Sequence, residues 1–381
     1  MNAPQNQKTT SEILTDFTSY VFNHPSALTT YRELMTAISA EASPRVIIFT
    51  GPTGVGKSTL VKAACNRLLQ HYQAQMVAEP DFVPVVTISA VPPNGNAFSW
   101  KDFYIRLLTD QHEPLINRKL LLPRQGSLLP DHGLGERALE HSVADALRRA
   151  VEEYCRRRRT RYLIIDEAHH MLLVNTQQRL DCQFECLKSL TIQTGVTILL
   201  TGTYRLLDIL EQSGQLTRRS QVVNFPRYDM RRSSDLLSFR KVLGFLEAEL
   251  SKYIPTRLDE NAEYFYRKSA GCVGILKDWL TLCLEHALDE GVTAIDAVFA
   301  ERFALKNRGL LTIAEEACLG EAKLADVGDD RLTDLLKNGV LLARDEPSLP
   351  TRRRRPGQRN PKRDPVGKDE RGQGSGFRTA A

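Results

Sequence analysis

One run of residues has the types and the spacing needed to hold a chain of phosphates. Between an apolar stretch and a helical pattern, the segment from Gly51 to Ser58 fits G-x-x-x-x-G-K-[ST] without exception. In such a loop backbone N–H groups point at phosphate oxygens, the lysine reaches the β- and γ-phosphates, and the serine hydroxyl binds Mg²⁺. We therefore expect nucleotide contacts at Gly51, Pro52, Thr53, Gly54, Val55, Gly56, Lys57, Ser58 and Thr59.

A pair of carboxylates follows the apolar run 162–165. Asp166 and Glu167 thus stand at the carboxyl end of an expected strand, the edge at which α/β sheets bind ligands. Asp166 is expected to hold Mg²⁺ together with Ser58, and Glu167 to orient the water that attacks the γ-phosphate. Taken alone, the pair also fits a solvated acidic turn, but the upstream glycine loop favours the catalytic interpretation.

Two later segments offer groups for the same reaction. Thr203 follows the expected strand 196–200, so its hydroxyl is a candidate contact to the γ-phosphate or the attacking water. Arg218 and Arg219 precede the next expected strand, and one of them is the candidate for an arginine offered to a neighbouring subunit's phosphates. The alternatives are an ordinary strand-ending turn and a solvated basic turn.

A zinc site is a weaker hypothesis. His169 and His170 lie near Cys182 and Cys186, which share a helix face at i, i+4. The histidines are adjacent, however, and no four-ligand spacing of the usual kind is present. Seven cysteines without a framework are typical of free thiols in a reducing compartment.

Short β-branched runs alternate with helical patterns in the first part of the chain, which predicts an α/β fold with a mostly parallel sheet covered on both faces. The expected strands are 45–50, 83–89, 162–165, 196–200 and 221–225, and the expected helices are 26–42, 58–75, 99–109 and 139–157. Beyond residue 226 the pattern is helical, at 234–250, 261–269, 274–288 and 293–304. Residues 111–135 are rich in turn formers and resemble an insertion.

Composition limits the remaining choices. The chain has 381 residues, 42% hydrophobic and 25% charged, with no run long enough for a membrane span and a polar N-terminus, so we expect a cytoplasmic protein without membrane contact. The net charge of +5 is unevenly distributed, with arginine runs at 156–159 and 352–355. Residues 351–381 have ten Lys/Arg, three Asp/Glu and almost no large apolar side chain, which predicts a disordered basic tail.

The expected organisation has five parts. An N-terminal segment (1–25) precedes the α/β core (26–228), which is followed by a helical lid (229–310), a C-terminal helical extension (311–350) and the basic tail (351–381).

The order of glycine loop, acidic strand, hydroxyl-bearing strand, arginine pair and helical lid resembles the AAA+ class of ATPases. Over residues 20–300, three local features are similar to the TnsC/TniB regulators of DNA transposition: the loop and helix 92–104, the strand end 199–203 and the segment 216–219 before Phe225. In one departure, Gly274 stands where AAA+ lids often have an arginine, which leaves Lys277 as a poor substitute.

The resemblance implies an ATP- and Mg²⁺-dependent homo-oligomer that winds around duplex DNA with little sequence preference, links a target-selecting protein to a transposase, and is remodelled by hydrolysis in the bacterial cytoplasm. It also suggests that Lys101 and the helix start at Ser99 contact DNA phosphates. Two other classes remain open: a replication initiator or helicase loader, and a signalling NTPase that does not bind DNA.

Overall fold

The computed structural model describes residues 9–40, 46–93, 97–113, 136–173, 177–210, 220–326 and 328–338. The chain divides into two compact units, Met1–Ala325 and Asp326–Ala381. The second contains the helix α14 (Asp329–Asn338), and the predicted basic tail 351–381 lies outside the described residues. No helix in the described ranges is long and apolar enough to cross a bilayer.

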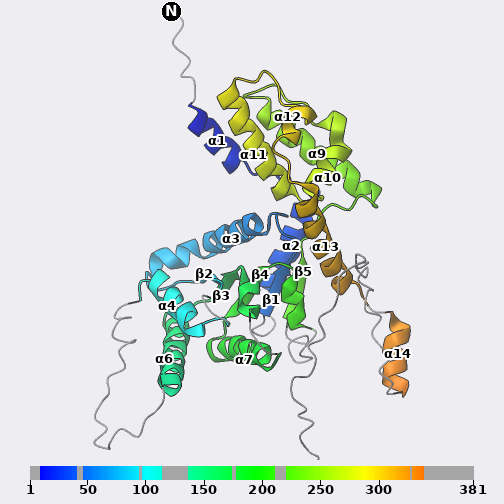
Figure 1. Cartoon of the computed structure of the whole chain (residues 1–381). Helices are drawn as coiled ribbons and strands as arrows, with labels where there is room; N and C mark the ends of the chain where they lie inside the picture. The colour runs from blue at the N-terminus through cyan, green and yellow to red at the C-terminus, as the bar shows by residue number, and fades with distance from the viewer. Residues whose placement is uncertain are drawn as a thin grey trace, which may run out of the picture. The chain divides into compact units, whose positions relative to one another are not determined.

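The first unit is built on a parallel five-stranded sheet with the order β2-β3-β4-β1-β5 (Figure 1). This confirms the predicted α/β fold. The strands are β1 (Val46–Thr50), β2 (Val85–Ser89), β3 (Tyr162–Asp166), β4 (Thr197–Gly202) and β5 (Ser220–Asn224). β1 lies between β4 and β5 and is buried along its whole length, so the loop that follows it starts from a rigid position.

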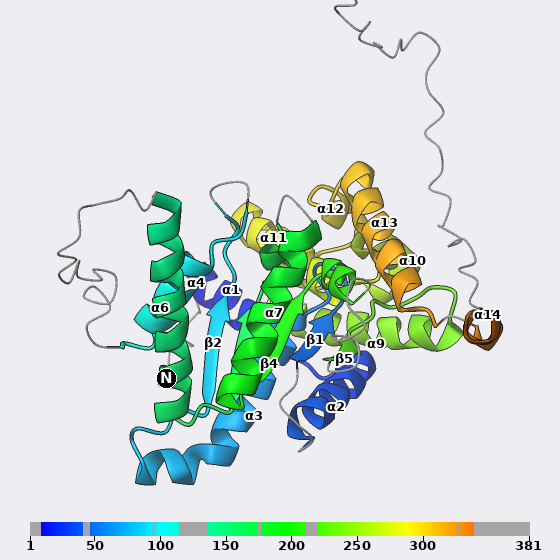
Figure 2. The ribbon, with the colours of Figure 1, turned by 90° about the horizontal axis from the view of Figure 1, so that it is seen from below.

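Helices cover both faces of the sheet because side chains of a strand point alternately to either side. Ile47 and Phe49 pack with α2 (Pro25–Ser39) and α3 (Lys57–Ala78). Val46 and Ile48 pack on the other face, in a core shared with α4 (Trp100–Asp110), α6 (Glu136–Arg157) and α7 (Gln177–Thr194). Figure 2 shows α6 and α7 along this side of the strands.

The segment after β5 forms a separate helical core, which we call the lid. Its helices are α9 (Ser233–Leu250), α10 (Ala262–Ser269), α11 (Val273–Glu290) and α12 (Ala297–Glu301), and α13 (Asn307–Leu324) follows them. The helix expected over 293–304 is wrong in length, because Ile295 pairs with Thr256 in a β-bridge and Asp296 caps a helix of only five residues.

The N-terminal helix α1 (Thr10–Ser19) belongs to the lid core. Its Phe17 is fully buried there, against α11, which contributes about 2 kcal/mol to the attachment. A capping box holds its first turn, since Thr9 and Glu12 each accept a hydrogen bond from the other's backbone N–H. This helix was missing from the sequence-based prediction, although T-x-x-E is its usual signal.

Candidate nucleotide-binding site

The glycine loop connects β1 to α3, which begins at Lys57. The loop turns through two glycines in the left-handed region, Gly54 (φ +74°) and Gly56 (φ +109°). Lys57 Nζ donates to the carbonyl oxygens of Gly51 (2.9 Å) and Pro52 (2.8 Å). Burial lowers the pKa of Lys57 to about 8, while Glu167 and Asp166 counteract this shift. The ammonium group is therefore poised over the loop, facing two carboxylates.

The acidic pair lies where β3 ends. Asp166 Oδ1 accepts hydrogen bonds from the Glu167 N–H (2.9 Å) and from the hydroxyl of Thr201, a fully buried residue of β4. This fixes the Asp166 carboxylate next to Ser58 in a cavity of about 540 Å³ that both residues line. A carboxylate and a hydroxyl are ligands that suit Mg²⁺, so the side chains present fit the predicted metal site. Thr201, at the same strand end as the predicted Thr203, was not predicted to make this contact.

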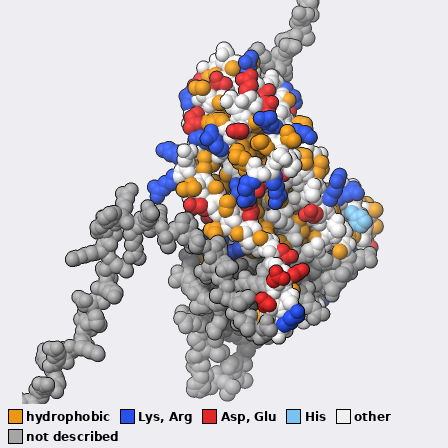
Figure 3. Space-filling view, turned by 90° about the vertical axis from the view of Figure 1, so that its right-hand side faces the viewer, with side chains coloured by type: hydrophobic (Ala, Val, Ile, Leu, Met, Phe, Trp, Pro, Cys, Tyr) orange, Lys and Arg blue, Asp and Glu red, His pale blue; other side chains and the backbone are white. Residues whose placement is uncertain are grey.

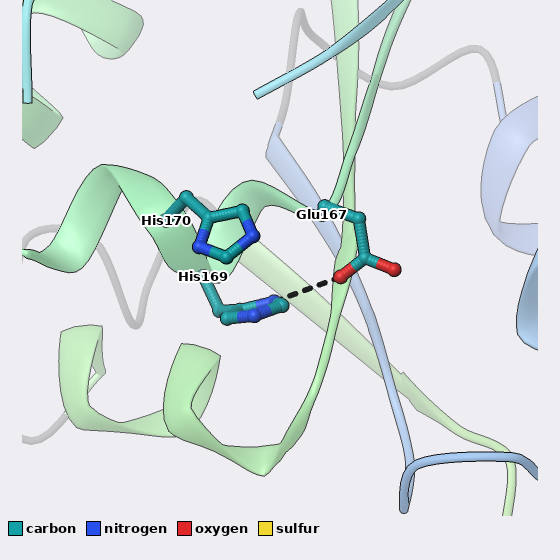
Figure 4. A group of neighbouring side chains, drawn as sticks. All are labelled: Glu167, His169 and His170. Carbon is teal, nitrogen blue, oxygen red and sulfur yellow. Dashed lines mark ion pairs between the residues drawn. The ribbon is translucent and has the colours of Figure 1, made fainter. Parts of the chain in front are cut away.

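Glu167 has an unusual backbone for a non-glycine residue, with φ 50° and ψ 32°. Such a conformation costs on the order of 1 kcal/mol and is retained where the surrounding structure imposes it, often at functional sites. Its side chain is about half exposed, and Oε2 lies 3.2 Å from His169 Nδ1 (Figure 4). The carboxylate is thus reachable by a water molecule and oriented by a neighbouring imidazole.

His169 is neutral at physiological pH. Burial, followed by the positive charges of His170, Arg205 and Lys57, lowers its pKa to about 4. The contact to Glu167 is therefore between a carboxylate and an uncharged ring. His170 completes a group whose ligand-type atoms lie within 4.8 Å of one another. The zinc hypothesis also included two cysteines. The side chain of Cys182 lies outside the described residues, and Cys186 is not part of this group.

Thr203 follows β4 directly, and its hydroxyl is buried without a hydrogen-bond partner among the described residues. A buried polar atom without a partner is rare, because its desolvation costs about 1–3 kcal/mol. An incoming phosphate or a bound water would satisfy it. The candidate arginines, Arg218 and Arg219, lie outside the described residues.

A second cavity, of about 350 Å³, continues from the loop toward the lid. Gly56 and Thr59 line it from the core, Val273 and Gly274 from the lid, and the segment 20–24 from the N-terminal side. It has the size and apolar lining suited to a nucleobase. The contribution of 20–24 was not predicted from the sequence, although its aromatic residues Tyr20 and Phe22 were a usable signal.

Gly274 contacts the glycine loop directly. A Cβ at this position would lie 2.4 Å from the carbonyl oxygen of Gly54, whose oxygen also accepts the Ile275 N–H (3.2 Å). The position therefore has no room for an arginine. Lys277 does not replace it, since its Nζ donates to the carbonyls of Thr18 and Tyr20, both at 2.7 Å. The lid thus holds the N-terminal segment against the cavity.

His24 attaches the end of the segment 20–24 to the core. It caps α2, accepting the Ala27 N–H (3.4 Å), and its Nδ1 lies 2.7 Å from the Tyr228 hydroxyl. Burial lowers its pKa to about 4, well below the value of about 6.5 for an unfolded chain. The contribution of His24 to folding stability is therefore greatest above pH 6.5 and falls as the pH drops toward 4, because the unfolded chain takes up a proton that the folded one excludes.

We expect acidification from about pH 7 to pH 5 to remove about 2 kcal/mol of unfolding free energy through His24. His24→Asn keeps a capping side chain without a titrating group, so its denaturation midpoint should fall less over this range. Urea unfolding of both proteins at each pH measures the difference, and parallel pH profiles would contradict the assignment.

The predicted DNA contacts lie at the start of α4. Ser99 caps the helix by accepting the Asp102 N–H (3.2 Å), and Lys101 in the first turn has no ion pair within the described ranges. By contrast, the arginines at 156–159 all have acidic partners, namely Glu152, Glu153, Asp81 and Glu79. This run precedes β3, so it lies at the opposite edge of the parallel sheet from the glycine loop.

Comparison with known families agrees with this geometry. The sequence over residues 40–210 matches the family model described as an AAA domain. Over this range the chain is similar to AAA domains. The matched range contains the glycine loop, the acidic pair, Thr203 and four strands of the five-stranded parallel sheet, which with its flanking helices has the AAA+ P-loop ATPase fold.

Similar solved structures include the Walker-type ATPase PABY2304 of Pyrococcus abyssi (17% identity, 77% of this chain and 73% of that chain, TM-score 0.40). Another is ORC2 of Aeropyrum pernix in ADPNP–ADP complexes (14% identity, 84% of this chain and 83% of that chain, TM-score 0.46). A third is RuvB of Thermotoga maritima (13% identity, 81% of this chain and 76% of that chain, TM-score 0.36). Comparison with curated protein sequences gives no match.

Proposed function

We propose that the AAA domain binds and hydrolyses ATP with Mg²⁺. One observation carries this proposal: Lys57, Asp166 and Glu167 meet at the carboxyl ends of β1 and β3, close enough for both carboxylates to affect the lysine's pKa. Lys57 would hold the β- and γ-phosphates, Ser58 and Asp166 the Mg²⁺, and Glu167 the attacking water. Bound Mg²⁺ would neutralise the charge that develops on the phosphate oxygens.

The side chains of this site would act mainly by positioning the Mg²⁺, the phosphates and the attacking water. The Thr201 hydrogen bond keeps Asp166 in place, and Thr203 offers a hydroxyl from the neighbouring strand end. The adenine would occupy the cavity between the glycine loop, the N-terminal segment and the lid. Arg218 or Arg219 of an adjacent copy would complete the phosphate environment, which makes hydrolysis depend on homo-oligomerisation.

We further propose that the protein is a TnsC/TniB-like regulator of DNA transposition in the bacterial cytoplasm. In this proposal ATP-bound copies assemble on duplex DNA, link a target-selecting protein to a transposase, and are remodelled by hydrolysis. The sequence features at 92–104, 199–203 and 216–219 motivate it. Lys101 adds support, because it has no ion-pair partner among the described residues and stands on a rigid helix start, where Trp100 packs against Phe103 and Tyr104.

DNA binding is tested by removing one charge. We expect Lys101→Ala to weaken ATP-dependent binding to random duplex DNA at least about tenfold, since a contact of on the order of 1 kcal/mol is repeated by every subunit along the DNA. ATP affinity of the free protein should not change. Fluorescence anisotropy at several salt concentrations measures both the affinity and its salt dependence.

Lys241→Ala is the matched control, because it removes an exposed lysine from α9 without an effect on the α4 surface. Equal DNA affinity of Lys101→Ala and Lys241→Ala would contradict a contact at Lys101. No DNA binding by the parent protein at any salt concentration would favour a signalling NTPase. Electron microscopy with a non-hydrolysable ATP analogue distinguishes continuous filaments on DNA from the closed rings expected of a loader.

A further inference from the structure

The helix α13 lies across the segment that follows β4, a 3₁₀ helix η2 (Tyr204–Ile209). The two elements are in close contact at Gly320, where a Cβ would lie 2.1 Å from the ring of Tyr204. That ring is buried, so the helix backbone rests directly on it. Any larger residue at position 320 must push α13 away from η2 or displace the tyrosine.

Ion pairs hold α13 at two points. Lys323 pairs with Asp208 of η2. Glu321 makes a two-point contact with Arg227, with Nε–Oε1 at 2.8 Å and a second N–O distance of 3.2 Å, and Arg227 is only 11% exposed. Arg227 follows β5 and also donates to Cys318 Sγ (3.2 Å). Two ion pairs and the contact between Gly320 and the Tyr204 ring therefore attach α13 to the core beside the nucleotide site.

The attachment buries little apolar surface. Among the described residues, α13 has three buried residues in its 18, whereas α11, of the same length, has eight. Leu311 and Leu319 remain 60% and 41% exposed. Figure 3 shows the side of the molecule where α13 lies in Figure 1, with hydrophobic side chains among Lys and Arg. Since apolar burial is the main stabilising contribution to packing, α13 is much easier to detach than α11.

A cavity of about 220 Å³ lies beneath α13. Its floor is formed by Pro52 and Thr53 of the glycine loop with Thr203 and Arg205, and its roof by α13 residues including Ala317 and Gly320. Pro52 accepts a hydrogen bond from Lys57, and Thr203 has the unsatisfied hydroxyl, so this floor borders the expected γ-phosphate position. α13 therefore covers the approach to that phosphate from outside.

We propose that α13 is an autoinhibitory latch, which covers the surface where a second copy of this chain must dock to bring an arginine to the γ-phosphate. This proposal rests on the proposed ATPase function and on completion of the site by an adjacent copy. In the single chain α13 shields the cavity. Docking of a neighbour competes with α13 for this surface, releases the helix and opens the site to assembly.

The test compares two glycines of the same helix. Gly320→Leu cannot keep its contact with Tyr204, whereas Gly309→Leu adds the same side chain where no atom lies within 4 Å. Both substitutions raise helix propensity equally. We expect Gly320→Leu to assemble with ATP at a protein concentration at least about fivefold lower than the parent or Gly309→Leu, because the latched state no longer competes.

Charge reversal provides a second route that leaves the packing intact. Lys323→Asp places two carboxylates together and should release α13, while the double variant Lys323→Asp with Asp208→Lys should restore the latch and the parental assembly threshold. Sedimentation with ATP measures assembly, and hydrogen exchange of α13 reports its release. The latch proposal is contradicted if α13 exchanges faster in Gly320→Leu or Lys323→Asp while the protein concentration needed for assembly stays unchanged or rises. It is also contradicted if neither variant releases α13.

The parent protein separates this outcome from failure of the proposed function. A parent that neither binds ATP nor assembles with it refutes the proposed function. A parent that assembles with ATP, together with an unchanged threshold in both released variants, refutes only the latch.

Discussion

Lys57→Ala should lose ATP binding almost completely. Its ammonium group contacts the loop carbonyls of Gly51 and Pro52 and is a charged donor for the β- and γ-phosphates. Loss of two charge-assisted hydrogen bonds from Lys57 to the phosphates would cost about 3 kcal/mol of binding free energy or more, which lowers the ATP affinity over about 100-fold. Isothermal titration with ATP measures this loss directly.

Arg67→Ala is a suitable control, since it removes an exposed positive charge from the same helix. It should bind ATP as the parent does. Because Lys57 is only half-buried and its two hydrogen bonds are to carbonyls of the loop itself, the alanine variant is also expected to remain folded, with a denaturation midpoint no more than a few degrees below that of the parent. Parental ATP affinity in Lys57→Ala would refute the phosphate-binding role of the loop.

Glu167→Gln should separate binding from hydrolysis. The amide retains the size of the side chain and its contact with His169, but it cannot polarise a water molecule as a carboxylate does. We expect kcat to fall at least about 100-fold, the effect typical of losing a general base, with an unchanged Kd for ATP. The variant should accumulate ATP-bound assemblies.

Single-turnover hydrolysis together with nucleotide titration tests this expectation, and Glu33→Gln, an exposed carboxylate of α2, serves as the control. A normal turnover rate for Glu167→Gln would assign the water to another group. His169 is the nearest alternative, because its neutral ring lies beside the same carboxylate.

The sequence was sufficient for the parts of the molecule that depend on local pattern. All five strands were predicted within three residues of their ends, because β-branched runs and their flanking turns are local signals. The glycine loop was likewise recognisable from eight consecutive residues. The structure brings Lys57, Asp166, Glu167 and Thr203 to one edge of the sheet, as expected from strand ends in a parallel sheet.

Features that depend on distant partners were not predictable. Burial of Phe17 requires the lid helices, which follow it by more than two hundred residues. The two carbonyl contacts of Lys277 need the N-terminal segment in place, and the contact of Gly320 with Tyr204 joins helices far apart in sequence. The helix expected at 293–304 was wrong for the same reason, since the β-bridge at Ile295 is made with Thr256.

The contact between Lys277 and the N-terminal segment has a kinetic consequence. Residues 20–24 form one wall of the 350 Å³ cavity. Lys277 of the lid holds this wall and the end of α1 by donating to the carbonyls of Tyr20 and Thr18. A nucleotide bound in this cavity as proposed would leave on this side only when residues 20–24 move, and α1 would have to move with them. With the proposed nucleotide bound, its residence time would depend on this short stretch ahead of the glycine loop, and a factor that binds the stretch and pulls it from the lid would speed nucleotide exchange.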